Sequence, residues 1–169
     1  MRFILAEDIN LNRKSNIYIT GVMGAGKSTY ADKLAKETGK EVWNIDKFHP
    51  FQDPKEQKYT DWIRAYCPEL LDKYNKSIDY TDEEHSELVE KFVKWTVAQS
   101  DLIVEGIQLL DLDDLIDLDQ HRFILLDVTF DQTSERANKR DCSKLSLDDY
   151  EIFKDDLVRL RNNNRIEIR

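Results

Sequence analysis

Residues 21–28 read Gly21-Val22-Met23-Gly24-Ala25-Gly26-Lys27-Ser28, a complete Gly-x-x-x-x-Gly-Lys-Ser motif. The glycines allow the backbone to curl so that successive N–H groups point at a phosphate chain. In such a loop the lysine reaches the outer phosphates and the serine hydroxyl binds Mg²⁺. The motif therefore predicts a nucleotide-phosphate site formed by Gly21, Met23, Gly24, Ala25, Gly26, Lys27, Ser28 and Thr29.

The flanking residues supply the strand–loop–helix setting that this motif requires. The segment Asn16-Ile17-Tyr18-Ile19-Thr20 indicates a short buried strand. From Ser28 to Thr38 the apolar residues recur at helical spacing, and Gly39 suits the position after a helix C-terminus. The local pattern thus predicts a strand, the phosphate loop and a helix in direct succession.

Apolar runs of strand length recur along the 169 residues, at 3–6, 17–19, 41–45, 102–104 and 123–128, with a weaker alternating run at 165–168. Helical patterns lie between them, at about 83–99 and from a predicted capping box, Ser146 with Asp149, to Leu160. This alternation is typical of an α/β fold with a parallel sheet between layers of helices. A chain of this length is expected to form a single domain, 1–169.

The chain is acidic, with a formal net charge of −9 and a pI of about 4.9. Residues 69–119 hold 15 Asp and Glu against 4 Lys, whereas residues 120–169 balance 10 against 10. Such a charge repels nucleic acid, so we expect a small-molecule partner and expect any positive potential at a phosphate site to be local.

Cysteine spacing and hydropathy restrict the class of protein further. Cys67 and Cys142 have neither metal-ligand spacing nor a disulfide framework, which is typical of reduced thiols. No run approaches the ~20 apolar residues of a membrane span, and the N-terminus lacks a signal-peptide pattern. The sequence therefore predicts a cytoplasmic protein without a membrane partner, and it carries no signal for an oligomeric state.

Acidic residues follow two of the predicted strands. Asp46 comes directly after the 41–45 run, and Glu105-Gly106 follow the 102–104 run. Ligands of open parallel sheets lie at the carboxyl ends of the strands, so both carboxylates are expected beside the phosphate loop. We predict that Asp46 binds a phosphoryl acceptor, and that Glu105 binds either Mg²⁺ or the acceptor. Each could alternatively be a helix cap or a surface charge.

Two further segments are candidates for the site. Arg136 and Arg140 are four residues apart and share a helix face, so they are predicted to stabilise transferring phosphate; a solvated basic face is the alternative. The aromatic segment at about 48–82 holds all three prolines and is predicted to cover the acceptor, with Arg64 in contact with it. Its alternative is a surface excursion whose aromatic residues pack on the core.

Taken in order, these features resemble the small P-loop kinases of nucleosides, nucleotides and metabolites, over about 16–145. Val104-Glu105-Gly106 is similar to the Asp-Gly of nucleoside monophosphate kinases and the Glu-Gly of zeta-type toxin kinases. Asp46-Lys47-Phe48-His49-Pro50 looks like the Asp-x-x-His-Pro of gluconate kinases, and polynucleotide 5′-kinases share the loop and the strand-end Asp. The resemblance implies five parallel strands in order 2-3-1-4-5 and a short lid at about 136–144, with ATP and Mg²⁺ as cofactors.

The resemblance has gaps, since the Gly-Phe-Pro-Arg tail of adenylate kinases and the serine-bearing third strand of gluconate kinases are missing. Residues 1–15 and the acidic stretch 111–119 also match no part of the pattern. We expect transfer of the γ-phosphoryl group of ATP to a small acceptor, a nucleoside or nucleotide. The alternatives are a polynucleotide 5′-hydroxyl kinase, a sugar-acid kinase and a non-catalytic ATP-binding module. The expected catalytic residues are Lys27, Asp46, Arg136 and Arg140.

Overall fold

A computed structural model describes residues 15–128 and 147–169. Within this part of the chain all sheet pairings are parallel and join five strands in the order β2-β3-β1-β4-β5. The strands are β1 (Ile17–Thr20), β2 (Glu41–Asn44), β3 (Leu102–Glu105), β4 (Arg122–Leu125) and β5 (Glu167–Ile168). The α/β fold class and the strand order implied by the family resemblance are therefore confirmed.

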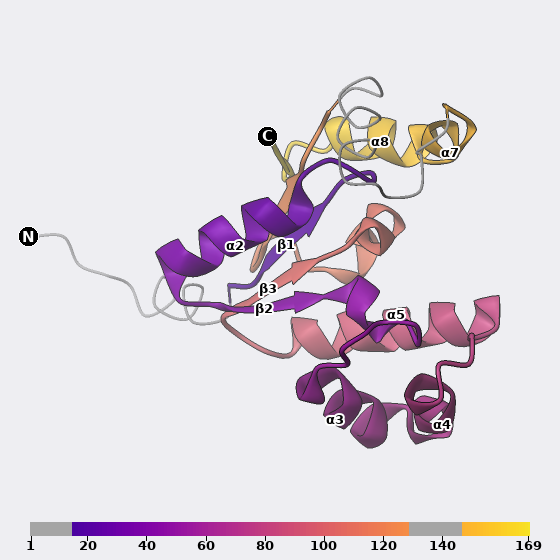
Figure 1. The fold of residues 1–169 in the computed structure, drawn as a ribbon. Helices are drawn as coiled ribbons and strands as arrows, with labels where there is room; N and C mark the ends of the chain where they lie inside the picture. The colour runs from indigo at the N-terminus through magenta and orange to yellow at the C-terminus, as the bar shows by residue number, and fades with distance from the viewer. Residues whose placement is uncertain (1–14, 129–146) are drawn as a thin grey trace, which may run out of the picture.

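Helices cover both faces of the sheet, which gives the three expected layers (Figure 1). The helix α2 (Lys27–Thr38) packs on one face, against Ile17 and Ile19 of β1. On the other face, α5 (Asp82–Val97) and α8 (Lys154–Arg161) pack in the same cluster as Tyr18. Because neighbouring residues of a strand point to opposite faces, the fully buried β1 supplies both clusters.

The two long helices begin and end at recognisable signals. The residue before α2 is Gly26, with φ of 92°, and the helix ends at Gly39, with φ of 73°, in the left-handed conformation that glycine adopts without strain. A capping box between Thr81 and Glu84 sets the start of α5 at Asp82, close to the predicted start at about residue 83. The helix ends at Val97, slightly before the predicted end at about residue 99.

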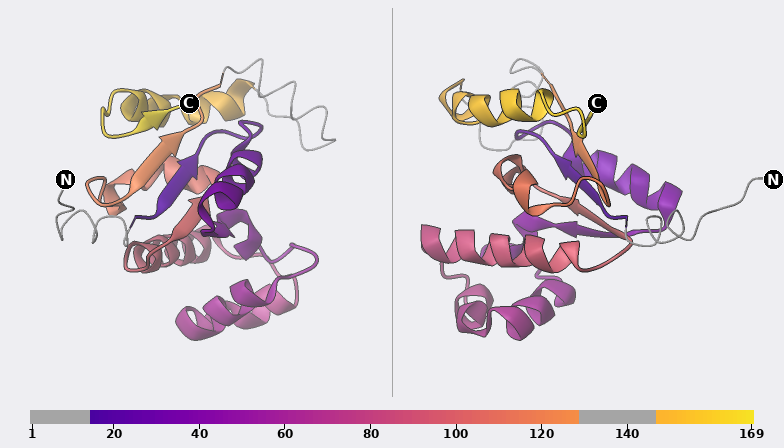
Figure 2. Two further views of the ribbon diagram at one scale, coloured as in Figure 1. Left: turned by 90° about the vertical axis from the view of Figure 1, so that its left-hand side faces the viewer. Right: turned by 180° about the vertical axis from the view of Figure 1, so that it is seen from behind.

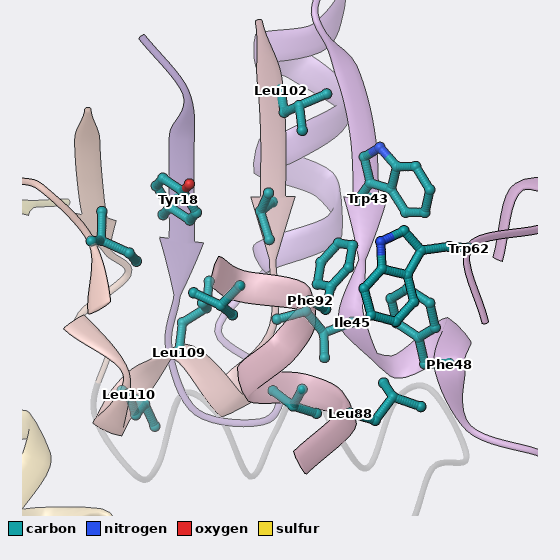
Figure 3. Close-up of a cluster of buried hydrophobic side chains, with 14 of the residues drawn as sticks. Tyr18, Trp43, Ile45, Phe48, Trp62, Leu88, Phe92, Leu102, Leu109 and Leu110 are labelled. Atoms are coloured by element: carbon teal, nitrogen blue, oxygen red, sulfur yellow. The ribbon is translucent and has the colours of Figure 1, made fainter. Parts of the chain in front are cut away.

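The segment after β2 begins with η1 (Ile45–Phe48) at the end of that strand. The helices that follow, α3 (Gln57–Tyr66), η2 (Pro68–Leu70) and α4 (Leu71–Asn75), lie beside α5, on its side away from the sheet (Figures 1 and 2). Most of its aromatic residues are buried, and Figure 3 shows Phe48 and Trp62 gathered with Trp43 and Phe92. The segment therefore extends the core; its role as an acceptor cover stays a prediction.

The predicted single helix from Ser146 to Leu160 is wrong, because the chain forms two helices, α7 (Leu147–Ile152) and α8. At Phe153 the backbone N–H donates to the carbonyl of Tyr150 at 3.1 Å, a tight i→i+3 turn that redirects the chain. The turn packs Phe153 against the core and leaves Ile152 exposed.

After β3 the chain forms two further 3₁₀ helices, η3 (Ile107–Asp111) and η4 (Asp113–Leu115). Several predictions lie outside the described residues: the apolar run 3–6, the lid at about 136–144 and the capping serine at 146. Of the helices that the structure describes, none is both long and apolar enough to span a membrane.

Candidate active site

Three neighbouring strands deliver the predicted site residues to one edge of the sheet. The phosphate loop leaves β1, Asp46 lies in η1 directly after β2, and Glu105 is the last residue of β3. In the order β2-β3-β1 these strands are adjacent and parallel, so their carboxyl ends meet. This is the edge at which open α/β sheets bind ligands.

The phosphate loop is held closed by short contacts. Its turn includes Gly24 and Gly26 at φ of 81° and 92°, and the N–H of Ala25 donates to the carbonyl of Val22 at 3.1 Å. The amine of Lys27 donates to the same carbonyl at 3.0 Å, so the lysine lies back on its own loop. These contacts define the curl of the loop and hold Lys27 beside it.

Ser28 and Glu105 are brought together across the site. The Ser28 hydroxyl donates to Oε1 of Glu105 at 2.9 Å, and Glu105 is only 3% exposed. Its second oxygen, Oε2, is buried and has no hydrogen-bond partner in the described part of the chain. Burial raises the pKa of the Glu105 carboxyl, while the Ser28 hydrogen bond and the charge of Lys27 oppose that shift.

This pair has the chemistry of an incomplete Mg²⁺ site. Mg²⁺ prefers oxygen ligands and in phosphoryl-transfer enzymes takes one or two from the protein, with phosphates and waters supplying the rest. Among residues 15–128 and 147–169, no group of three or more His, Cys, Asp or Glu could hold a metal ion. A hydroxyl and an unsatisfied carboxylate oxygen beside a phosphate loop fit a metal that arrives with a nucleotide.

Asp46 is fixed by contacts from both sides. Its backbone N–H donates to the side chain of Asn44 at 2.9 Å, which starts η1. Its Oδ1 accepts from the amide of Gln108, in η3, at 2.8 Å. Two residues along, Phe48 is fully buried and contacts Phe92 with ring centroids 4.7 Å apart. The core therefore holds η1 in place and leaves Asp46 exposed at the sheet edge.

Gly106 makes room for the Gln108–Asp46 contact. A Cβ at Gly106 would lie 2.5 Å from Oε1 of Gln108, so the end of that side chain would have to move, and it would lie 3.0 Å from Cβ of Ile45. The hydroxyl of Thr20 donates to the Gly106 carbonyl at 2.9 Å, which ties this turn to the end of β1. The missing side chain at Gly106 therefore leaves Gln108 in its position beside Asp46.

Two cavities flank this row of residues. One, of about 580 Å³, borders the phosphate loop and is lined by Ala25, Gly26, Thr29, Tyr30, Lys33, Leu126, Val128 and Arg169. The other, of about 430 Å³, lies on the side of Asp46, where Gln108 and His85 contribute to its wall. Burial and the neighbouring His49 lower the pKa of His85, and Asp46 opposes the shift.

Sequence reasoning missed Gln108 and His85 as site residues. Gln108 follows Gly106 by two residues, and this position next to a strand-end glycine is the only local signal for it. His85 stands in a helix, and only the packing of α5 against η3 brings it to this edge.

Three arginines were predicted to belong to the site, and the described structure places only one of them, Arg64. Arg64 is exposed on α3 and pairs with Asp61 at 3.1 Å, and within the described residues no contact joins it to Asp46 or Glu105. Arg136 and Arg140 lie in the part of the chain that the structure does not describe. Their assignments stay predictions.

Solved structures with a similar fold are kinases of small molecules. A gluconokinase from Sinorhizobium meliloti 1021 superposes with a TM-score of 0.61 at 19% identity, over 93% of this chain and 82% of that one. A shikimate kinase from Aquifex aeolicus has a TM-score of 0.53 at 15% identity, over 90% of this chain and 84% of that one. A deoxyadenosine kinase from M. mycoides has a TM-score of 0.50 at 16% identity, over 91% of this chain and 89% of that one. At these identities the likeness establishes the fold.

None of the curated proteins compared matches the sequence of this chain. The sequence pattern of the AAA domain family, in contrast, matches residues 17–165, which runs from β1 through the phosphate loop and the strand-end carboxylates to the last turn before β5. Because this match covers most of its length, the chain belongs to the AAA domain family.

Proposed function

We propose that the protein is an ATP-dependent kinase that transfers the γ-phosphoryl group of ATP, in the presence of Mg²⁺, to a hydroxyl group of a small acceptor. One observation carries the proposal: the adjacent strands β2, β3 and β1 bring Asp46, Glu105 and the phosphate loop to a single edge. Phosphoryl transfer needs a phosphate cradle, a metal ligand and a group that orients the acceptor, and this edge supplies all three.

On the nucleotide side, the loop N–H groups would bind the phosphate chain, and Lys27 would leave the Val22 carbonyl to neutralise the outer phosphates. Ser28 and Glu105 would hold Mg²⁺, which supplies charge neutralisation on the phosphates. The cavity of about 580 Å³, with Tyr30, Leu126 and Val128 in its wall, is placed to take the nucleotide base.

On the acceptor side, Asp46 would orient a hydroxyl toward the γ-phosphorus and accept its proton late in the reaction. A bond forms between the acceptor oxygen and the γ-phosphorus, the bond from that phosphorus to the bridging oxygen breaks, and ADP leaves. Arg136 and Arg140 are proposed to stabilise charge on the group in transfer. For a phosphate acceptor no base is needed, and Asp46 would bind metal or a ribose hydroxyl instead.

The structural neighbours support a small acceptor. The names of three of them, gluconokinase, shikimate kinase and deoxyadenosine kinase, each describe a kinase of a small molecule. The net charge of −9 argues against a polynucleotide, since a nucleic-acid enzyme uses a basic surface to attract its substrate. We propose that the enzyme is cytoplasmic, because cysteines without disulfide or metal-ligand spacing are typical of a reducing compartment.

The test is an acceptor screen of the purified full-length protein, read as ADP release with ATP and Mg²⁺. The panel contains nucleosides, nucleotides, neutral sugars, sugar acids and an oligonucleotide with a free 5′-hydroxyl. We expect ADP release that depends on one class of small acceptor. Release only with the oligonucleotide would replace the proposal with a polynucleotide kinase. ATP binding with no release for any acceptor would instead identify a non-catalytic module.

A further inference from the structure

The cavity of about 430 Å³ opens beside Asp46, between the first half of α5, the helix η3 and the start of α8. Gln108, part of its wall, donates its amide to Oδ1 of Asp46 at 2.8 Å. His85, from the opposite wall, lies close enough to Asp46 and to His49 for their charges to affect its pKa. Asp46 does not line the cavity itself; Gln108, which does, joins it to the cavity wall.

The wall of this cavity combines apolar and hydrogen-bonding groups. Val89, Ile107 and Leu110 provide apolar surface, and His85, Ser86 and Gln108 provide hydrogen-bonding groups. This mixture and the size of the cavity are typical of sites for small organic molecules. The volume of the cavity, about 430 Å³, is large enough for a ring that carries hydroxyl groups.

The charge of the wall is negative. The carboxylates of Glu90, Asp111 and Asp156 line the cavity, and no described Lys or Arg lines it. Two cations lie next to these carboxylates: Lys94 pairs with Glu90 at 2.9 Å, and Arg159 pairs with Asp156 and Asp113, both at 2.7 Å. No ion pair joins Asp111 to a described Lys or Arg, so the carboxylates outnumber these cations. Burial and the charge of Asp156 raise the pKa of Asp111, the direction expected where negative charge is incompletely balanced.

We propose that this cavity binds the body of an acceptor that is uncharged or positively charged, such as a nucleoside, a neutral sugar or an amino sugar, and that it rejects phosphate esters and sugar acids. This inference rests on the proposed kinase function and narrows it. Hydroxyl and ammonium groups can donate to the three carboxylates and to His85. A bound anion would lose its water beside Asp111, which has no ion pair among the described residues, and beside carboxylates that already pair with Lys94 and Arg159.

The experiment compares charge-matched acceptors in the ADP-release assay: adenosine with AMP, cytidine with CMP, and glucose with glucosamine and gluconate. We expect kcat/KM for the best uncharged or cationic compound to exceed that of its anionic counterpart by at least tenfold. An anion that equals or exceeds its neutral counterpart overturns the inference while the kinase function stands. If no compound of any charge releases ADP, the proposed function fails and the inference falls with it.

A pair of variants tests the cause of the preference. Asp111→Lys places a cation in the cavity wall, and it should reduce the preference for the uncharged acceptor by at least tenfold. Asp114→Lys makes the same charge change at an exposed position of η4 outside the cavity wall, and it should leave the preference unaltered. Asp111→Asn, a milder change, should move the preference in the same direction. An identical shift in the Asp111→Lys and Asp114→Lys variants would overturn the assignment to this cavity.

Discussion

The two sides of the candidate active site are built in different ways. On the nucleotide side, consecutive residues from Gly21 to Thr29 supply backbone N–H groups, one amine and two hydroxyls. On the acceptor side, Asp46 comes from η1, and the cavity wall comes mainly from α5, η3 and the start of α8, which lie far apart in the sequence. A local loop can bind the same phosphate chain in many proteins, whereas a wall assembled from several segments can be changed one side chain at a time.

The two sides also differ in charge. Lys33 and Arg169 line the cavity beside the phosphate loop, and Lys27 lies in the loop itself. The cavity beside Asp46 has Glu90, Asp111 and Asp156 in its wall. Although the chain is acidic as a whole, it has lysine and arginine side chains where a nucleoside triphosphate would lie and carboxylates where the acceptor would lie. Variants on each side should therefore fail in distinct steps of the reaction.

The largest effect is expected on the nucleotide side, in the Lys27→Ala variant. The change removes the cation that neutralises the outer phosphates, so kcat should fall by at least about a thousandfold, equivalent to about 4 kcal/mol of transition-state stabilisation. Circular dichroism should show an unchanged fold. Lys36→Ala, at an exposed position of the same helix, serves as the control and should stay active. Near-normal ADP release by Lys27→Ala would refute the kinase assignment.

The matching change on the acceptor side is Asp46→Asn. It removes the carboxylate that orients the acceptor but preserves the size of the side chain, so phosphoryl transfer should fall by about a hundredfold to ten-thousandfold. ATP affinity, measured by calorimetry, should be unchanged. Asp72→Asn, in an exposed ion pair on α4, is the control. Loss of ATP affinity with transfer otherwise retained would move Asp46 from the acceptor side to the nucleotide side.

The boundary between the two sides is tested by Arg136→Ala and Arg140→Ala. If these residues act on the phosphoryl group in transfer, each variant should lower kcat by about a hundredfold. ATP affinity should change less than tenfold, because only interactions that strengthen in the transition state raise kcat. Titration of ATP and of acceptor against each variant gives both quantities. Wild-type kinetics in both variants would indicate the solvated basic face instead.

The nucleotide side was predictable from the sequence because its chemistry is local. The spacing of Gly21, Gly26 and Lys27 defines the loop, and the apolar runs around it place β1 and α2 to within a residue or two. Asp46 and Glu105 were found because strand ends in a parallel sheet meet at one edge. To apply this rule one needs only to know where each strand ends, and the apolar runs in the sequence indicate those ends.

The acceptor side was predictable only in part because it depends on packing between distant segments. His85 reaches the site through the contact of α5 with η3, and no local pattern distinguishes it from other helix residues. The break at Phe153 was missed for the same reason: the apolar spacing is continuous, and only the core decides that Phe153 is partly buried while Ile152 is exposed. The negative wall of the cavity beside Asp46 could not be predicted from the sequence either, because its carboxylates come from separate segments.

The smallest expected effect concerns Glu105, which lies between the two sides of the site. Its substitution should lower activity but raise the thermal stability of the protein. Glu105 is buried with one oxygen unsatisfied, so its charge costs free energy in the folded protein until a cation binds. Glu105→Gln removes that charge while an amide oxygen can still accept from Ser28. We expect the variant to lose phosphoryl transfer and yet to unfold at a Tm about 2–4 °C higher at neutral pH, equivalent to about 1 kcal/mol.

The dependence on pH identifies the cause of this gain. Because burial raises the pKa of Glu105 in the fold, the folded protein binds more protons than the unfolded chain between the two pKa values, and its stability falls as pH rises through that interval. Glutamine does not titrate, so the Tm advantage should be complete above the raised pKa and should vanish below about pH 4. Glu37→Gln, exposed on α2, should show neither effect. A lower Tm for Glu105→Gln at neutral pH would mean that attraction to Lys27 outweighs the cost of burial.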